Sequence, residues 1–201
     1  MKLLSLVFAV IFAATAAAQS AEKPVVILVG APSSGKSTQA EMIQKRYNFA
    51  LITREQLLKD DPSVLARSKT PGLNGIEPRV DPALNGLFVK RLEKTDISKG
   101  LLLDGYPATK DHGDFMLKVG AQKGLGKPLI LKLEVPDAVV RQRLKGQKPE
   151  QIEQDLKDYH RETDFLSVYF PSANIVKING EGKPDAVFEQ IRKAIDQYVK
   201  R

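Results

Sequence analysis

The chain has 201 residues, of which 42% are hydrophobic and 27% are charged, values that suit one soluble globular domain with a sizeable core. It contains no cysteine, so disulfides and cysteine-ligated metal sites are excluded. The formal net charge is +7, but lysines and arginines are scattered and no run of five basic residues occurs, so we expect a solvated basic surface and no nucleic-acid partner.

The N-terminal segment is typical of a secretory signal peptide. One lysine near the start is followed by an almost wholly apolar stretch over residues 3–14 and by Ala16-Ala17-Ala18, a site of the small-x-small kind. We expect residues 1–18 to be removed, or cleavage after Ser20, and residues 19–201 to be exported to the periplasm or secreted. The apolar stretch is short for a transmembrane helix, so no stable membrane span is expected after cleavage. A misassigned start and an uncleaved anchor are the alternatives.

The next segments predict a strand, a glycine-rich turn and a helix. Residues 24–29 form a valine-rich apolar run typical of a buried strand, and a helix is expected over residues 34–47. Between them, residues 30–37 read Gly-Ala-Pro-Ser-Ser-Gly-Lys-Ser and match G-x-x-x-x-G-K-[ST] at every fixed position. The pattern alone is moderately specific, but a preceding strand and a following helix are the context that supports it.

This loop predicts a site for a nucleoside triphosphate and Mg²⁺. Its glycines permit backbone angles that side chains would block, so successive N–H groups turn toward the β-phosphate. Lys36 reaches the β- and γ-oxygens, and the hydroxyl of Ser37 binds Mg²⁺. The predicted nucleotide-binding residues of the loop are Gly30, Ser33, Ser34, Gly35, Lys36, Ser37 and Thr38.

The rest of the chain alternates short apolar runs with longer helical segments, which predicts a parallel α/β fold. Thr53 is a good cap for the helix after the second strand, whereas residues 60–79 are rich in proline, glycine, asparagine and serine and are expected to be irregular. Asp104 ends the third strand, at the sheet edge where ligands bind, so we expect it to hold Mg²⁺ through water; a strand-end turn is the alternative. The remaining strands are predicted at 49–52, 101–103, 128–135 and 175–178, and the remaining helices at 82–94, 110–119, 137–145, 149–162 and 185–200.

The chain resembles adenylate kinase and its relatives over nearly all of residues 19–201. The phosphate loop followed by Thr38-Gln39 and the Asp-Gly-Tyr-Pro segment at 104–107 carry most of the likeness, together with Val135-Pro136-Asp137 and Arg143-Leu144. The resemblance implies a P-loop NTPase fold, a three-layer sandwich with a five-stranded parallel sheet and a reduced lid. It also implies transfer of the γ-phosphate of ATP to a nucleoside monophosphate, with Mg²⁺ as cofactor and Arg143 along the nucleotide base.

Several arginines that hold phosphate in the family are replaced in this chain. Lys59 stands where the family's acceptor-site segment ends in arginine, and Ala108 stands at a second arginine position. Asp155 stands at a third, in the lid, which reverses the charge. His112 falls where the family has a glutamine that reads the acceptor base. The resemblance thus implies an acceptor site of Arg54, Lys59, Gly105 and His112, with Lys36 and Lys59 as the catalytic residues.

Three functions remain open from the sequence. The first is a divergent nucleoside monophosphate kinase, or a relative that phosphorylates another small acceptor. The second is a non-catalytic nucleotide-binding protein with a kinase fold, which export would favour because ATP is scarce outside the cytoplasm. The third is slow triphosphate hydrolysis coupled to an unknown partner. We expect a monomer whose partners are a nucleoside triphosphate and a small phosphate acceptor.

Overall fold

The computed structural model of the chain describes residues 22–68, 82–171 and 174–200. The predicted signal peptide, residues 1–18, lies outside this part of the chain. The elements are β1 (Val25–Gly30), α1 (Lys36–Tyr47), β2 (Ala50–Thr53), α2 (Arg54–Asp60), α3 (Pro62–Ser68), α4 (Ala83–Glu93), β3 (Leu101–Asp104), α5 (Lys110–Gln122), β4 (Leu129–Glu134), α6 (Asp137–Arg143), α7 (Pro149–Tyr169), β5 (Ile175–Asn179) and α8 (Pro184–Tyr198).

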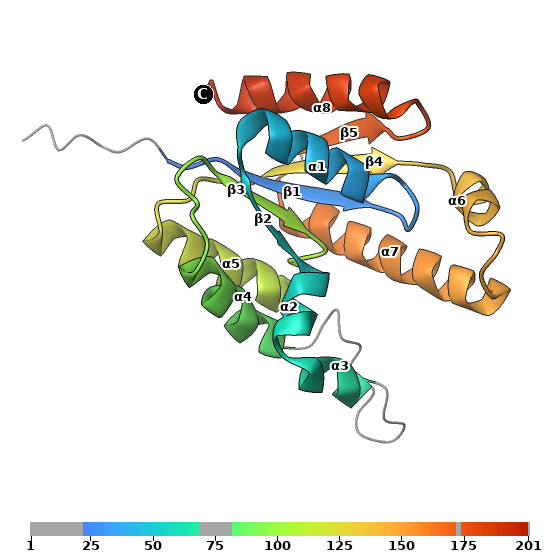
Figure 1. Cartoon of the computed structure of the whole chain (residues 1–201), viewed down its shortest axis with the longest axis horizontal. Helices are drawn as coiled ribbons and strands as arrows, with labels where there is room; N and C mark the ends of the chain where they lie inside the picture. Colours follow the sequence, from blue (N-terminus) through green and yellow to red (C-terminus); the bar gives the residue numbers. More distant parts are fainter. Residues whose placement is uncertain (1–21, 69–81, 172–173, 201) are drawn as a thin grey trace, which may run out of the picture.

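The five strands form one parallel sheet in the order β2-β3-β1-β4-β5. Helices α1 and α8 lie on one face, and α4, α5 and α7 lie on the other (Figure 1). The predicted α/β fold with a five-stranded parallel sheet between two helical layers is therefore confirmed. Only residues 144–148 connect α6 to α7, which is where a reduced lid was expected.

The central strand β1 is buried at all six positions because both faces of the sheet are covered. Val25, Ile27 and Val29 belong to the core shared with α4, α5 and α7, whereas Val26 and Leu28 belong to the core shared with α1 and α8. Successive side chains of a strand point to opposite faces, so a doubly covered strand needs an apolar residue at every position. This explains why the segment is a continuous apolar run rather than an alternating one.

The sheet register brings the carboxyl ends of three strands together. Asp104 pairs with Leu28 of β1 on one side and with Thr53 of β2 on the other. Thr53 also caps α2 as predicted: its Oγ1 accepts a hydrogen bond from the backbone N of Gln56 at 3.1 Å, and its own N donates to Oε1 of Gln56 at 2.9 Å. This reciprocal capping fixes the start of α2, and therefore Arg54, at the same edge as Asp104.

The prediction that residues 60–79 are irregular is wrong for their first part, which forms α3; residues 69–81 lie outside the described ranges. Oδ1 of Asp61 accepts a hydrogen bond from the N of Ser63 at 3.0 Å, and Pro62 occupies the first position of the helix. Proline costs little there because the first N–H of a helix has no intrahelical partner in any case. The proline therefore starts a helix at a point where it was taken to prevent one.

Helix α7 extends to Tyr169, beyond the predicted end at residue 162. The hydroxyls of Thr163 and Ser167 each donate to the carbonyl four residues earlier, at 2.8 Å, so both side chains are satisfied within the helix. Thr163 is also buried. Across the part of the chain that the structure describes, no helix is both long and apolar enough to span a bilayer.

Candidate functional site

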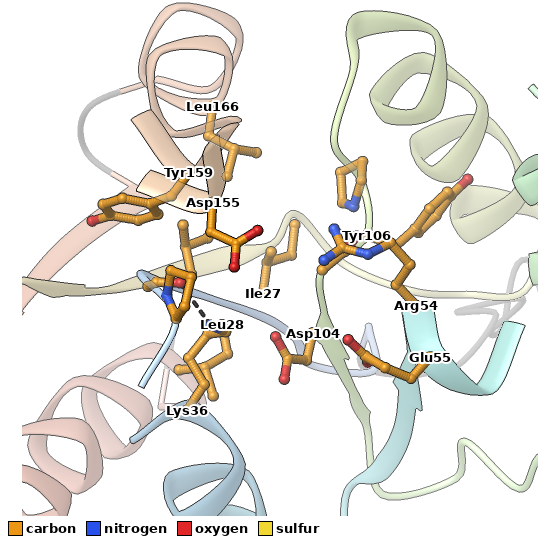
Figure 2. Close-up of a pocket in the computed structure, with 15 residues that line it drawn as sticks. Ile27, Leu28, Lys36, Arg54, Glu55, Asp104, Tyr106, Asp155, Tyr159 and Leu166 are labelled. Atoms are coloured by element: carbon orange, nitrogen blue, oxygen red, sulfur yellow. Dashed lines mark hydrogen bonds between the residues drawn. The ribbon is translucent and has the colours of Figure 1, made fainter. Parts of the chain in front are cut away.

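A cleft of about 260 Å³ opens at the carboxyl edge of the sheet. The end of β1 and the loop after it form its floor, the start of α2 and the segment after β3 form one side, and α7 forms the other (Figure 2). Its apolar surface comes from β1, from Tyr106 and Pro107, and from α7. The charged residues that line it are Lys36, Arg54, Glu55, Asp104 and Asp155.

Two glycines of the phosphate loop lie where a larger residue would be disfavoured. A Cβ at Gly30 would lie 2.6 Å from Oγ of Ser34 and 3.1 Å from Cβ of Leu133, so any side chain there would force both neighbours to move. Gly35 has a φ of 95°, in the left-handed region that other residues rarely adopt. Gly35 is also the N-cap, so α1 begins at Lys36 and not at Ser34 as predicted. Close packing thus accounts for the first glycine of the motif, Gly30, and backbone conformation accounts for the second, Gly35.

The N-terminus of α1 is suited to bind an anion. Its N-cap is a glycine, no side chain caps it, and its first turn has no acidic residue. Nζ of Lys36 donates to the carbonyl oxygens of Gly30 at 2.6 Å and Ala31 at 3.2 Å, which holds the ammonium group at the loop. Helix amides and a lysine at one glycine-rich loop provide the donors that a β- and γ-phosphate requires.

The two residues predicted to bind Mg²⁺, Ser37 and Asp104, carry side-chain oxygens, which are the ligands that this ion prefers. Asp104 lines the cleft and is 9% exposed, and Ser37 lies in the first turn of α1 with an exposed side chain. Within residues 22–68, 82–171 and 174–200 no cluster of three or more histidines, cysteines or acidic residues could hold a metal ion by itself. The oxygens of Ser37 and Asp104 suit Mg²⁺, which is usually bound through one or two protein oxygens together with nucleotide phosphates and water.

Arg54 is the cation on the side of the cleft away from the phosphate loop. Its Nη1 donates to the carbonyl oxygen of Gly105 at 3.2 Å, and its guanidinium points into the cavity (Figure 2). Gly105 has a φ of 72°, and a Cβ there would lie 3.2 Å from the arginine side chain. The glycine therefore lets the arginine lie close against the backbone after β3.

The structure brings only some of the predicted site residues into the cleft. Gly30, Lys36, Arg54, Asp104 and Gly105 line it. The predicted acceptor residue Lys59 is instead exposed in the last turn of α2, and neither it nor His112 is among the lining residues.

His112 is 1% exposed, and its ring packs against that of Tyr106 with 5.1 Å between the centroids. Its Nδ1 lies 3.5 Å from the backbone N of Ala108. Arg143 is exposed and also lies outside the cleft lining, where its Nη1 donates to the carbonyl of Ser33 at 2.9 Å. Contacts of His112 and Arg143 with a nucleotide stay predictions.

Sequence reasoning did not assign Glu55, Tyr106, Tyr159 or Leu166 to the cleft, although all four line it. Burial raises the pKa of the hydroxyls of Tyr106 and Tyr159, so both side chains stay neutral. A signal for Tyr159 was available, because it lies four residues after Asp155 on one helix and so on the same face. Glu55 follows Arg54 directly, in the first turn at the same sheet edge.

Because Gly35 has a left-handed conformation, its replacement by alanine should lower the free energy of unfolding. The same replacement at Gly86, a glycine inside a helix, serves as the comparison. Gly35 and Gly86 are both exposed, and neither would place a Cβ within 4 Å of another group. Gly35→Ala should lower the free energy of unfolding by about 1–2 kcal/mol, because alanine disfavours a φ of 95°. Gly86→Ala, inside α4, should raise it by about 0.5–1 kcal/mol. Urea denaturation measures both, and equal effects of the same sign would contradict the assigned conformation.

The phosphate loop connects the first strand of a parallel sheet to the first helix, and an aspartate ends the adjacent strand. This arrangement defines a P-loop nucleotide-binding protein. The family model for adenylate kinase matches residues 28–175. The chain therefore belongs to the adenylate kinase family, a family of enzymes that use ATP.

Individual relatives support this membership along most of the chain. Adenylate kinase isoenzyme 1 of Cyprinus carpio is 33% identical, over 86% of this chain and 94% of that protein. The human isoenzyme 1 is 29% identical with the same coverage. The adenylate kinase of Methanothrix thermoacetophila is 26% identical over 86% of this chain and 99% of its own length. The likeness thus extends over whole relatives and not over the phosphate loop alone.

Proposed function

We propose that the chain is a phosphotransferase of the nucleoside monophosphate kinase type, which converts ATP and a nucleoside monophosphate to ADP and a nucleoside diphosphate. The observation that carries the proposal is a complete phosphate loop, with the ammonium of Lys36 held at it, in the same cleft as Asp104 and Arg54. Family membership supports the same chemistry.

Each of the residues at the cleft has a separate role in in-line phosphoryl transfer. Amides of the loop and of α1, together with Lys36, hold the β- and γ-phosphates. Ser37 and Asp104 would hold Mg²⁺, which neutralises charge on the phosphates when bound. Arg54 faces the cavity from the other side, where it can stabilise negative charge on the transferring group. Positioning and charge stabilisation account for most catalysis in this reaction class.

A non-catalytic nucleotide-binding role is the second candidate, and two residues favour it. Ala108 and Asp155 occupy positions where the family pattern has arginines, so the cleft has fewer cations than that pattern requires. A coupled assay of ADP formation separates the candidates when ATP is supplied with and without Mg²⁺ and with each nucleoside monophosphate in turn. Acceptor-dependent ADP supports the kinase, acceptor-independent ADP supports hydrolysis, and ATP binding without ADP supports the binding role.

We also propose that the protein is exported and that its signal peptide is cleaved, since the first 18 residues have the sequence pattern of such a segment. Intact-mass measurement on protein recovered from its native host should give a chain that begins at Gln19, or at Ala21 if cleavage follows Ser20. A cytosolic product that retains residues 1–18 would contradict the proposal.

A further inference from the structure

Lysines gather at the edge of the sheet opposite to the cleft. All five strands are parallel and start at this edge, and the helices that precede them in the chain end there, on the left of Figure 1. We call the described residues before β1, between a helix and the next strand, and after α8 the amino edge: residues 22–24, 48–49, 94–100, 123–128, 170–171, 174 and 199–200. The charged residues of the amino edge are Lys23, Lys94, Lys99, Lys123, Lys127 and Lys200, together with Glu22 and Asp96.

This concentration of positive charge is not a general feature of the loops. The amino edge has a net charge of +4, out of a formal +7 for the whole chain. The connections from a strand to the following helix, at the edge where the cleft opens, carry only Glu181 and Lys183 and so have no net charge. The fold therefore gathers lysines that are scattered along the sequence, and it places them away from the nucleotide site.

Contacts between neighbouring connections bring several of these lysines onto one face. Nζ of Lys23 donates a hydrogen bond to the carbonyl oxygen of Lys123 at 3.1 Å. Hydrogen bonds from Ser98 lower the pKa of Asp96, and the nearby charges of Lys23 and Lys99 lower it further. The segment before β1 thus lies between the connection that precedes β3 and the one that precedes β4, and all three carry lysines.

Two exposed apolar side chains lie beside the lysines. Leu117, near the end of α5, is 37% exposed, and Val199 is 47% exposed. Each lines a hollow that also includes Lys127, of about 170 Å³ for Leu117 and about 510 Å³ for Val199. A protein surface that binds at the interface of a bilayer combines apolar side chains, which enter the headgroup region, with lysines that meet the lipid phosphates.

A nucleic acid would also attract lysines, but the amino edge lacks the groups that bind bases. No arginine occurs among its described residues, and its aromatic residues, Phe49 and Phe170, are both buried. Arginine forks and exposed aromatic rings are the usual means of base recognition and stacking. The sequence before Glu22 favours a membrane, because the apolar stretch of residues 3–14 has the pattern that directs a chain to one and precedes this edge.

We infer that the amino edge docks onto an anionic lipid bilayer; the inference goes beyond the proposed phosphotransferase function and does not depend on it. Each lysine near an anionic surface strengthens binding roughly fivefold, so a net charge of +4 on one edge supports reversible attachment. Leu117 and Val199 add apolar contact with the headgroup region. The cleft opens at the opposite edge of the sheet, so it stays accessible to nucleotides in a bound molecule.

The experiment measures co-sedimentation with vesicles, and it uses the chain that begins at Gln19, which contains every described element. Vesicles of phosphatidylglycerol and phosphatidylcholine in equal amounts should bind this chain at least about tenfold more tightly than vesicles of phosphatidylcholine alone. Salt at about 1 M, where the Debye length is about 3 Å, should release most of the bound protein. Equal binding to both kinds of vesicle would overturn the inference, and so would tighter binding to a DNA duplex than to the anionic vesicles.

A pair of charge reversals separates this edge from the rest of the surface. Lys123→Glu combined with Lys127→Glu should weaken binding to the anionic vesicles by roughly 100-fold or more, because four units of positive charge are lost. This variant should bind ATP as wild type does, since both exposed positions lie away from the cleft, and that result shows that it is folded.

The matched control is Lys145→Glu combined with Lys148→Glu. It makes the same change of charge at exposed positions between α6 and α7, outside the amino edge, and it should bind vesicles as wild type does. Equal loss of vesicle binding in the two double variants would mean that the net charge of the protein, and not the amino edge, is responsible, and the inference would fail.

Discussion

Lys36→Ala should weaken ATP binding by roughly 10- to 150-fold, which corresponds to the 1.5–3 kcal/mol typical of a hydrogen bond to a charged group. The ammonium is held at the phosphate loop by the carbonyls of Gly30 and Ala31, so it is in place to meet the β- and γ-phosphates. Phosphotransfer should fall further than binding does, because negative charge develops on the β-phosphate of the leaving ADP in the transition state, so a cation at this loop stabilises the transition state more than bound ATP. Isothermal titration with ATP measures the first effect and ADP formation the second.

The matched control is Lys45→Ala. Lys45 lies in the last turn of the same helix and is exposed, so its removal takes away the same charge from α1 without touching the loop. It should bind ATP as wild type does. Both variants should remain folded, since the hydrogen bonds from Lys36 to the carbonyls of Gly30 and Ala31 stay within its own loop. Equal affinity for ATP in wild type and Lys36→Ala would show that the nucleotide does not bind at this loop.

AMP should be a poor acceptor, with turnover below the 1–100 per second that is usual for kinases. Among the described residues that line the cleft, Arg54 is the one cation on the acceptor side that could bind the phosphate of AMP. Lys59 is exposed on α2 outside the lining, Ala108 supplies no donor, and Asp155 repels a phosphate. A lysine would in any case bind phosphate as a point charge, without the two-pronged geometry of arginine.

Ala108→Arg should restore part of this activity. The position follows Pro107, which lines the cleft, so an arginine placed there adds a cation near the acceptor. We expect the rate with AMP to rise about 10- to 100-fold, short of the 10³–10⁵ that a fully placed arginine contributes, because Asp155 leaves the lid side without a compensating cation. Ala121→Arg, exposed near the end of α5, adds the same charge elsewhere and should change nothing. Wild-type turnover of AMP within the usual kinase range would show that other cations replace the missing arginines.

The sequence predicted the parts of this fold and site that depend on local pattern. The structure confirms three of these local predictions: the buried apolar strand β1, the helix cap at Thr53, and the need for glycine at positions 30 and 35. The start of α3 was missed because Pro62 was treated as a breaker, although its effect depends on its position within the helix. The register of β1, β2 and β3 then explains why residues from separate segments meet at one edge.

The acceptor side could not be predicted to the same extent, because tertiary packing determines which side chains reach it. His112 and Lys59 were assigned by their positions in a pattern, but the packing of α5 against Tyr106 buries the histidine, and the helical turn that carries Lys59 leaves the lysine exposed. Asp155 was recognised only as a change of charge. Its orientation into the cavity depends on where α7 packs beside the sheet, which a local sequence pattern does not specify.

We propose that the cleft transfers the γ-phosphate of ATP to a small acceptor. The most direct measurement follows that phosphate: ATP labelled with ³²P at the γ position is incubated with the protein, Mg²⁺ and a mixture of nucleosides and nucleoside monophosphates, and the labelled species are separated. We expect label on an organic acceptor with the wild-type protein and loss of that label with Lys36→Ala. Label that remains on ATP, or that appears only as inorganic phosphate, would contradict it.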